Sequence, residues 1–487
     1  MKHLPPYAAG LIAVLLAASA SGSAIAGQSL QQIRYALFKD PSASVEGDLR
    51  LLAEKGDLAS QHLLANVLAT DPAQTREAVI FYKNAFADGR GEIVALASMA
   101  RLMDRNPRLR LENSDFFRAA LQRFAQTRDV QNLNTSLEVF VAYPEFFTPQ
   151  ATQSLIELYD RSCLVDCSSD LYRAILAERL GQIDQARTWY ERAMMTDVRA
   201  VDRYYAVLGE QQDPLFAAFA KTLVARLDNI PVEIVHRIGT QLDSISAERS
   251  VGLRYPVEPT KAALDRLPPA EQDTQKLAIE QVKSTVEAEA KTLRGDALIW
   301  LDNAVERGWV PAMVSKVNFM TSSPTEHSAS DTAALIERIG QSQPLRAKAL
   351  RVSLHLVTSW PTLDPFKAQA LIEELIAANY RDARMLLGDL YSHGGLDEPD
   401  QQKALSIYQE MAAGGSSTAY YRMASVYSSA RAICYDAVKA YTYARVAVEY
   451  GDSRAHNLLK ELERRMPKRD IEQALLAQAK LLKDVYQ

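Results

Sequence analysis

Cys163 and Cys167 are the residues of this sequence whose spacing suggests chemistry most directly. They are four positions apart in the stretch SCLVDCSS, so a helix or a turn can bring their Cα atoms within reach of a disulfide. A metal site would need two further ligands, and no histidine is close in the sequence. We expect a local disulfide if the chain is exported, with two buried thiols as the alternative. Cys434, the third cysteine, is expected to be a buried small apolar residue.

The histidines and glycines form no catalytic motif. The histidines beyond the N-terminal segment are spread one per region, at His62, His236, His327, His355, His393 and His456. The stretch GRGEIV at 89–94 lacks the third glycine of a nucleotide-binding loop and follows no strand signal. No P-loop, zinc-binding His-Glu pair or nucleophile elbow occurs. We therefore expect no catalysis, no cofactor and no metal, although an active site built from distant residues is compatible with the sequence.

The charge balance of the chain is mildly acidic, with 55 lysines and arginines against 60 aspartates and glutamates. This balance argues against a general nucleic-acid-binding protein, which needs a basic surface. The local basic cluster ERRMPKRD at 463–470 includes Arg464 and Arg465 and is either a solvated helix end or a contact for an anionic partner. The 21 tyrosines are mostly expected in the core, but Tyr420 and Tyr421 are candidates for an interaction surface.

The first residues have the pattern of a secretory signal peptide. A short positively charged start is followed by an apolar run from Ala8 to Ala18 and by the small-residue site AIA before Gly27. We expect residues 1–26 to be removed near Ala26–Gly27 and the rest of the chain to be periplasmic. No cysteine near that point offers a lipid attachment site. No later stretch reaches the roughly 20 apolar residues that a membrane-spanning helix needs, so the protein is not expected to be integral to the membrane.

A period of 36 residues dominates the C-terminal half of the sequence. Alanines, a glycine-type position and tyrosines keep fixed distances from one another through three successive units. The alanines are Ala368, Ala404 and Ala440, followed fifteen residues later by Ala383, Ala419 and Ala455. Eleven residues after the first set stand Asn379, Gly415 and Gly451, and twenty-three after its first two members stand Tyr391 and Tyr427. Ala297, Gly308 and Ala312 fit the same template upstream. Without any strand signal, this period indicates stacked helix pairs.

The residue types at the repeated positions give the period a physical reason. A glycine can take the left-handed conformation that ends a helix, and Asp452 and Ser453 are suitable starters for the next one. Ala440, Ala444 and Ala447 share one helical face and let a partner helix come close. One pair cannot bury its apolar face alone, so the pairs must stack. We predict an all-α fold, an α-solenoid in which antiparallel helix pairs form a right-handed superhelix.

These patterns divide the chain into five segments. They are a signal peptide (1–26), degenerate tetratricopeptide-like helical repeats (27–253), a proline-rich linker or irregular segment (254–276), clear repeats (277–466) and a capping helix (467–487). A polar loop is expected at 318–334. The capping helix is amphipathic, with Ile471, Leu475 and Leu482 on one stripe. A helix that binds a partner or a membrane surface is the alternative for this last segment.

The stretches KALSIYQEMAAGGSSTAYYRMASVY at 403–427 and KAYTYARVAVEYGDSRAHNLL at 439–459 resemble Sel1-like repeats, which are relatives of tetratricopeptide repeats. The general layout is similar to that of exported Sel1-like proteins that serve alginate secretion. The resemblance implies a periplasmic protein–protein interaction scaffold for exopolysaccharide secretion. Its implied partners are an outer-membrane porin, periplasmic polysaccharide-modifying proteins and an anionic polysaccharide. The alternatives are a polysaccharide-binding protein and a polysaccharide-degrading hydrolase or lyase.

Overall fold

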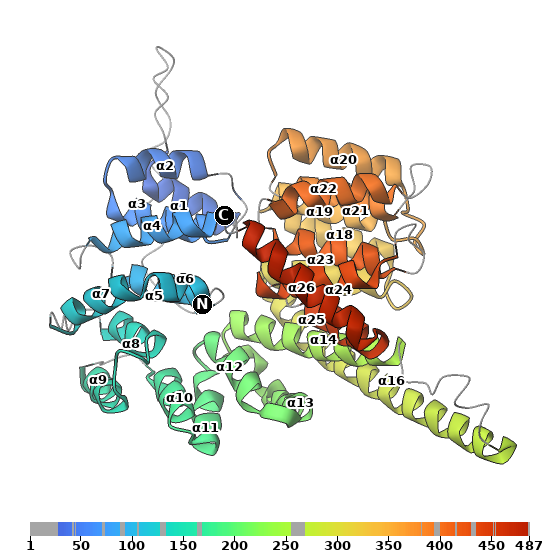
Figure 1. Ribbon diagram of the computed structural model, residues 1–487, viewed down its shortest axis with the longest axis horizontal. Coiled ribbons are helices and arrows are strands. Elements are labelled where there is room, and N and C mark those ends of the chain that lie inside the picture. The colour runs from blue at the N-terminus through green and yellow to red at the C-terminus, as the bar shows by residue number, and fades with distance from the viewer. Residues whose placement is uncertain are drawn as a thin grey trace, which may run out of the picture.

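The computed structural model describes residues 28–485 with internal gaps (Figure 1). The gaps are 41–42, 44, 71–73, 88–92, 105–106, 127–132, 163–167, 255–267, 381, 394–399, 414–415, 430–434, 451 and 453. The predicted signal peptide, its cleavage site and all three cysteines lie outside the described residues. The signal peptide and the Cys163–Cys167 disulfide therefore stay predictions.

Every regular element that the structure describes is a helix, and successive helices stack as antiparallel pairs (Figure 1). This arrangement is the all-α solenoid that the sequence predicts, while the right-handed sense of its superhelix stays a prediction. The helices up to the long central pair are α1 (Leu30–Lys39), α2 (Glu46–Glu54), α3 (Leu58–Leu68), α4 (Thr75–Phe86), α5 (Val94–Asp104), α6 (Pro107–Glu112), α7 (Ser114–Gln126), α8 (Leu133–Ala142), α9 (Pro149–Ser162), α10 (Asp170–Arg179), α11 (Ile183–Ala193), α12 (Arg199–Val207), η4 (Gly209–Gln211), α13 (Gln212–Leu223) and η5 (Val224–Asn229). The remaining helices are α14 (Val232–Arg254), α16 (Pro269–Glu306), α17 (Val310–Ser322), α18 (Ala329–Gly340), α19 (Pro344–Leu354), α20 (Pro365–Ala377), α21 (Ala383–His393), α22 (Gln401–Ala413), α23 (Ser417–Ser428), α24 (Ala437–Glu449), α25 (Arg454–Arg465) and α26 (Lys468–Val485).

A repeated aspartate cap starts α20, α22 and α24, the first helices of three successive pairs. Asp364, Asp400 and Asp436 each accept a hydrogen bond from the backbone N–H three residues later, at 3.0, 2.9 and 3.0 Å. That later residue is the lysine before the repeated alanine, and its ammonium lies 2.9, 3.0 and 3.6 Å from the same aspartate. The cap satisfies a backbone donor that the helix itself leaves without a partner, so the helix begins at this position.

One hydrogen bond recurs at the turn inside each pair. The backbone N–H of Tyr380 donates to the carbonyl oxygen of Leu375, five residues earlier, at 2.9 Å. The same bond joins Ser416 to Met411 at 3.1 Å and Asp452 to Ala447 at 2.9 Å. A bond of this span closes a helix end and reverses the chain direction.

The turn residues that the structure describes have left-handed backbones. Asn379 has a φ of 53° and Gly308 has a φ of 79°, and both follow the last turn of a helix. Gly415 and Gly451 lie outside the described residues. At Asn379 and Gly308 the left-handed cap therefore occurs where the sequence predicts it.

The repeated alanines lie at helix crossings, and all six are buried: Ala368, Ala383, Ala404, Ala419, Ala440 and Ala455. Their short side chains allow neighbouring helices to pack closely, which maintains native packing density across the pair. Among the described glycines, Gly388 in α21 has the least space for a side chain. A β-carbon built on Gly388 would lie 2.4 Å from Cε1 of Tyr408 in α22, so this crossing has no room for a side chain.

The long helix α16 occupies part of the predicted linker. It begins at Pro269, so the prediction of an irregular segment is wrong for 269–276, whereas 255–267 lies outside the described residues. Proline fits the first turn of a helix because its missing N–H has no partner there. One cluster of buried apolar residues runs from Leu171 to Trp360, so the core continues across this segment. The predicted loop at 318–334 is also too long, because α17 ends at Ser322 and α18 begins at Ala329.

The final helix, α26, packs against α24 and covers the last helix pair. Ala474 and Gln478 are buried, and Ile471 and Leu482 are partly buried against the same core. Leu475 is 40 % exposed, so its predicted place on the buried stripe is wrong. The small side chain of Ala474 takes the position nearest the core instead, because it allows the helix to approach closely.

Candidate functional site

The repeated tyrosines connect one repeat to the next. The carbonyl oxygens of Tyr391 and Tyr427 each accept a hydrogen bond of 3.0 Å from the backbone N–H of the next aspartate cap. The ammonium of Lys403 lies 5.3 Å from the ring centre of Tyr391, and that of Lys439 lies 5.1 Å from the ring centre of Tyr427. A cation over an aromatic face is attractive. These tyrosines therefore stabilise the stacking of the repeats.

Tyr420 is part of the core, which corrects its assignment to an interaction surface. It is only 3 % exposed. Its ring is parallel to that of Tyr450, with centres 5.6 Å apart, and it also stacks on Tyr443 at 6.3 Å. The sequence could not show this burial because two adjacent tyrosines on a helix face different directions, and only packing decides which one is inside.

Tyr421, the second tyrosine of that pair, is half-buried beneath Arg454. The guanidinium carbon of Arg454 lies 4.7 Å from the ring centre of Tyr421. Arg454 also pairs with Asp452 at 2.6 Å and donates a hydrogen bond to Thr418 at 3.0 Å. Because Arg454 is held on three sides, this contact joins α23 to α25 and leaves little of the Tyr421 ring for a partner.

Arg464 and Arg465 are exposed at the end of α25, together with Lys468 and Arg469 at the start of α26. We call these four residues the basic turn. Arg465 pairs with Glu461 at 3.0 Å. Within the described part of the chain, the other three have no carboxylate at ion-pair distance. The basic turn therefore presents positive charge to solvent at the C-terminal end of the solenoid.

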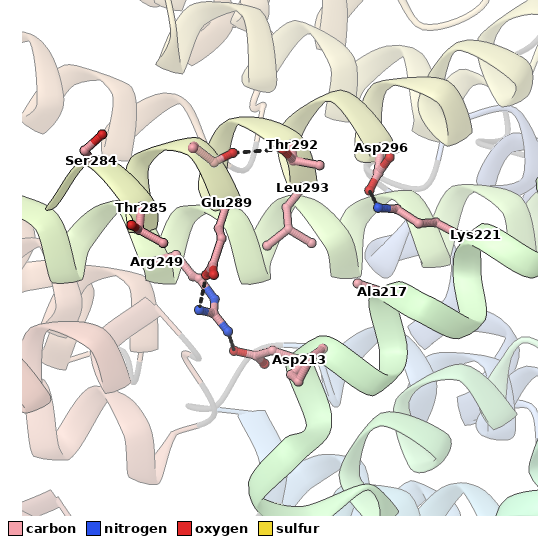
Figure 2. Close-up of a pocket in the computed structure, with 12 residues that line it drawn as sticks. Asp213, Ala217, Lys221, Arg249, Ser284, Thr285, Glu289, Thr292, Leu293 and Asp296 are labelled. Carbon is pink, nitrogen blue, oxygen red and sulfur yellow. Dashed lines mark hydrogen bonds and ion pairs between the residues drawn. The ribbon is translucent and has the colours of Figure 1, made fainter. Parts of the chain in front are cut away.

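A pocket of about 630 Å³ lies between α13, α14 and α16 (Figure 2). Its lining comes from three helices: Asp213, Pro214, Ala217 and Lys221 from α13, Arg249 from α14, and Ser284, Thr285, Ala288, Glu289, Thr292, Leu293 and Asp296 from α16. Helical spacing brings these residues to one face of α13 and one face of α16. The pocket is therefore a gap between α13 and α16, and α14 contributes Arg249 to its lining.

The charged side chains of the pocket are paired with one another. Arg249 lies 2.7 Å from Glu289 and 3.8 Å from Asp213, so it bridges α16 and α13 (Figure 2). Lys221 lies 3.2 Å from Asp296 at the other end. The lining residues include no histidine, cysteine or aromatic ring. The pocket thus offers no nucleophile with an adjacent base and no free cation for an anionic ligand.

Two partly buried histidines bridge neighbouring helix pairs through serine hydroxyls. Nε2 of His62 lies 3.1 Å from Oγ of Ser98, and Nε2 of His236 lies 2.9 Å from Oγ of Ser315. Burial disfavours the charged imidazolium and lowers the pKa of each histidine to about 4, so both rings are neutral at pH 7. Neither histidine lines the pocket. Across the described ranges, no group of three or more His, Cys, Asp or Glu residues is placed to hold a metal ion.

Asp389 forms a polar cluster that the sequence did not indicate. This buried carboxylate in α21 accepts a hydrogen bond of 2.7 Å from the hydroxyl of Tyr408 in α22. It also pairs with Arg422 in α23 at 2.8 Å. Burial and the adjacent carboxylate raise the pKa of Tyr408, so its hydroxyl remains a donor. The cluster joins three consecutive helices of two repeats.

Comparison with known proteins finds a curated relative that is similar over part of the chain. No family model matches the chain. Over 100 residues, the sequence is 37 % identical to the alginate biosynthesis protein AlgK of Azotobacter vinelandii. The match covers 20 % of this chain and 22 % of AlgK, so the chain spans about a fifth of the curated relative. The chain is thus similar to AlgK over a limited stretch.

A solved structure with a Sel1-like repeat fold is also similar. It is c5321, a protective antigen of uropathogenic Escherichia coli, at 14 % sequence identity. The match covers 90 % of this chain and 94 % of c5321, with a TM-score of 0.25. The two chains superimpose poorly at that score, so the fold assignment rests on the helix pairs themselves. In the part of the chain that the structure describes, no helix is both long and apolar enough to cross a membrane.

Proposed function

We propose that this protein is a periplasmic protein–protein interaction scaffold that supports assembly of an alginate-type exopolysaccharide secretion complex. The observation that carries the proposal is the 37 % identity to AlgK, an alginate biosynthesis protein. The solenoid supports it as well, because stacked helix pairs create an extended surface that suits protein binding. The proposed protein has no catalysis of its own and uses no cofactor.

The proposed location rests on the N-terminal sequence pattern, and the proposed partners rest on the resemblance to exported Sel1-like proteins. The N-terminal sequence pattern favours export, and its small-residue site AIA at 24–26 favours removal of residues 1–26. We propose an outer-membrane porin and periplasmic polysaccharide-modifying proteins as partners. Each partner would bind side chains on the outer and inner faces of the solenoid.

The basic turn is the surface that we assign to an acidic face of one of these protein partners. Arg464, Lys468 and Arg469 are exposed and lack carboxylate partners among the described residues. Complementary charge across an interface accelerates association and fixes orientation. Charge reversal at this turn therefore weakens binding without disturbing the buried alanine crossings.

Co-purification from an exopolysaccharide-secreting cell tests the proposal. The tagged wild-type chain is compared with Arg464→Glu/Arg469→Glu and with a matched double reversal of exposed lysines elsewhere, Lys55→Glu/Lys291→Glu. We expect the porin and the polysaccharide-modifying proteins to co-purify with the wild type and the control, and to be reduced with the basic-turn variant. If all three chains capture the partners equally, the basic turn is not part of the interface. If none of the chains captures any of the partners, the scaffold proposal is wrong.

A second candidate function, binding of an anionic polysaccharide, is favoured by the same exposed positive charge. Calorimetric titration of the purified chain with uronate oligomers distinguishes it. Heat of binding that disappears in Arg464→Glu/Arg469→Glu supports polysaccharide binding. Cleavage of the oligomers during the titration would instead indicate a hydrolase or lyase and contradict a purely non-catalytic role.

A further inference from the structure

The N-terminal end of the solenoid approaches the turn between α18 and α19. The side-chain amide of Gln343, in the turn between α18 and α19, donates a hydrogen bond of 3.1 Å to the backbone carbonyl of Lys39 at the end of α1. These residues are 304 positions apart. Burial raises the pKa of Tyr380; Arg346 opposes this shift, and the carboxylates of Asp382 and Asp40 add to it. The N-terminal helices therefore return to the turns of the C-terminal repeats.

We call the contact between Lys39 and Gln343 the seam, and it is a weak contact. Gln343 bonds to Lys39 near the surface, and one such hydrogen bond contributes little net stability because water replaces it readily. In the described ranges, the helices that pack extensively against one another are near neighbours along the chain. Neither α1 nor α2 packs in this way against α19 or α21. The seam thus lacks the helix–helix packing that holds the repeats together.

The junction opposite the seam is also loosely filled. Between α13 and the α14–α16 pair lies the pocket of about 630 Å³, and Arg249–Asp213 and Lys221–Asp296 bridge α13 to α14 and α16 respectively (Figure 2). Surface ion pairs hold less firmly than apolar packing and adapt to small movements. The ion-paired rim of this gap can adapt, while Phe216, Ala220 and Leu223 of α13 belong to the same buried cluster as residues of α14 and α16.

A fixed contact lies beside this gap. Arg307, at the end of α16, donates hydrogen bonds to the carbonyl oxygens of Leu227 at 3.3 Å and Ile230 at 2.8 Å. Asn303 adds a hydrogen bond of 3.0 Å to Asp228. These bonds tie η5 to the C-terminal end of α16. The chain therefore has a firm attachment here with a compliant gap next to it.

We propose that the solenoid opens and closes as a clamp. One arm is α1–α13 and the other is α14–α26, the pivot is the contact between η5 and the end of α16, and the seam is where the arms meet. Figure 1 shows the blue and teal helices of the first arm on one side and the orange and red helices of the second on the other, with α12, α13 and α14 at the lower centre and α16 extending to the lower right. Opening separates Lys39 from Gln343.

Small-angle X-ray scattering of the full chain tests the clamp. Gln343→Glu replaces the donor amide with a carboxylate that faces the Lys39 carbonyl and lies near Asp40, so it repels the first arm. Gln341→Glu places the same charge in the same exposed turn, where no hydrogen bond to α1 is made, and serves as the control. We expect a larger radius of gyration and maximum dimension for Gln343→Glu than for the wild type or the control, with unchanged helical circular dichroism.

Coinciding scattering curves for the three chains would overturn the clamp, because the arms would then be held by more than the seam. If Gln343→Glu loses helical signal, Gln343→Ala decides the question with the same readout. That variant removes the bond without adding charge, and a radius of gyration equal to that of the wild type would contradict the proposal. The result is independent of the partner experiments, since it needs only the purified chain.

Discussion

At the scale of single residues, the Asp389 cluster shows how a polar group can specify repeat stacking. The carboxylate is 9 % exposed and serves Tyr408 and Arg422 from two different helices. Sequence reasoning missed it because aspartate in a helix is usually on the solvent side. The only signal was indirect: Gly388, the residue before it, leaves the space in which the Tyr408 ring lies.

Replacing Asp389 with alanine leaves a buried hydroxyl and a guanidinium without their acceptor. Leaving a buried polar group unsatisfied costs about 1–3 kcal/mol. We expect Asp389→Ala to lower the free energy of unfolding by that amount in urea titrations followed by circular dichroism. The control is Asp273→Ala, whose exposed carboxylate is 3.7 Å from Lys276 and should change stability by less than about 0.5 kcal/mol. Equal effects of the two substitutions would contradict the assigned role.

Gly388 and Gly295 make a matched pair for testing the close crossing. A methyl group at Gly388 would collide with the Tyr408 ring, whereas none of the surrounding atoms comes within 4 Å of a β-carbon at Gly295. We expect Gly388→Ala to destabilise the protein by about 1–3 kcal/mol through overpacking. Gly295→Ala should stabilise it by about 0.4–1 kcal/mol, since alanine restricts the unfolded chain. A stabilising Gly388→Ala, measured by the same urea titration, would refute the crossing.

The two histidine–serine bridges predict a pH dependence. His62 and His236 have a folded-state pKa of about 4, below the ordinary value of 6.5, so the unfolded chain binds more protons between these values. Their contribution therefore lowers stability as the pH falls from about 6.5 to about 4 and is constant below that range. Thermal unfolding across this range should show a smaller loss for His62→Asn/His236→Asn than for the wild type. Parallel curves of thermal stability against pH for the wild type and the double variant would contradict this prediction. An equally reduced loss of stability in the exposed-site control His456→Asn would contradict it as well.

At the scale of the element, the repeat could be predicted from sequence because its physical causes are local. A glycine-type residue at the turn and alanine at the crossing each have a residue-type signature. The aspartate three residues before the repeated lysine has one too, but our prediction did not include it. The linker at 254–276 was predicted too long because proline breaks helices in their interior but is tolerated at the start, where Pro269 stands. Tyr420 was misplaced because burial depends on tertiary packing.

The aspartate caps can be tested one helix at a time. Asp400→Ala removes the acceptor for the backbone N–H of Lys403 and the ion pair with its side chain. Asparagine caps nearly as well as aspartate but carries no charge. We expect a lower thermal midpoint for Asp400→Ala than for Asp400→Asn, which should stay close to the wild type. If both variants melt alike and below the wild type, the ion pair rather than the cap starts α22.

At the scale of the whole molecule, the continuous core from Leu171 to Trp360 unites the two halves that the sequence suggested were separated. The sequence could not show this continuity, because it depends on α14 and α16 packing side by side across the segment between them. The function that we propose depends on surfaces far apart in the sequence, and only one of them, the basic turn, has a sequence signature. The seam between Lys39 and Gln343 has no sequence signature at all.

The uronic acid content of the culture medium tests the central claim, a role in exopolysaccharide secretion, most directly. It is measured in a polymer-producing strain that lacks this protein and is complemented in turn by the wild type, Arg464→Glu/Arg469→Glu and Lys55→Glu/Lys291→Glu. We expect loss of secreted polymer in the deletion strain, recovery with the wild type and the lysine control, and incomplete recovery with the basic-turn variant. Undiminished secretion in the deletion strain would contradict the central claim.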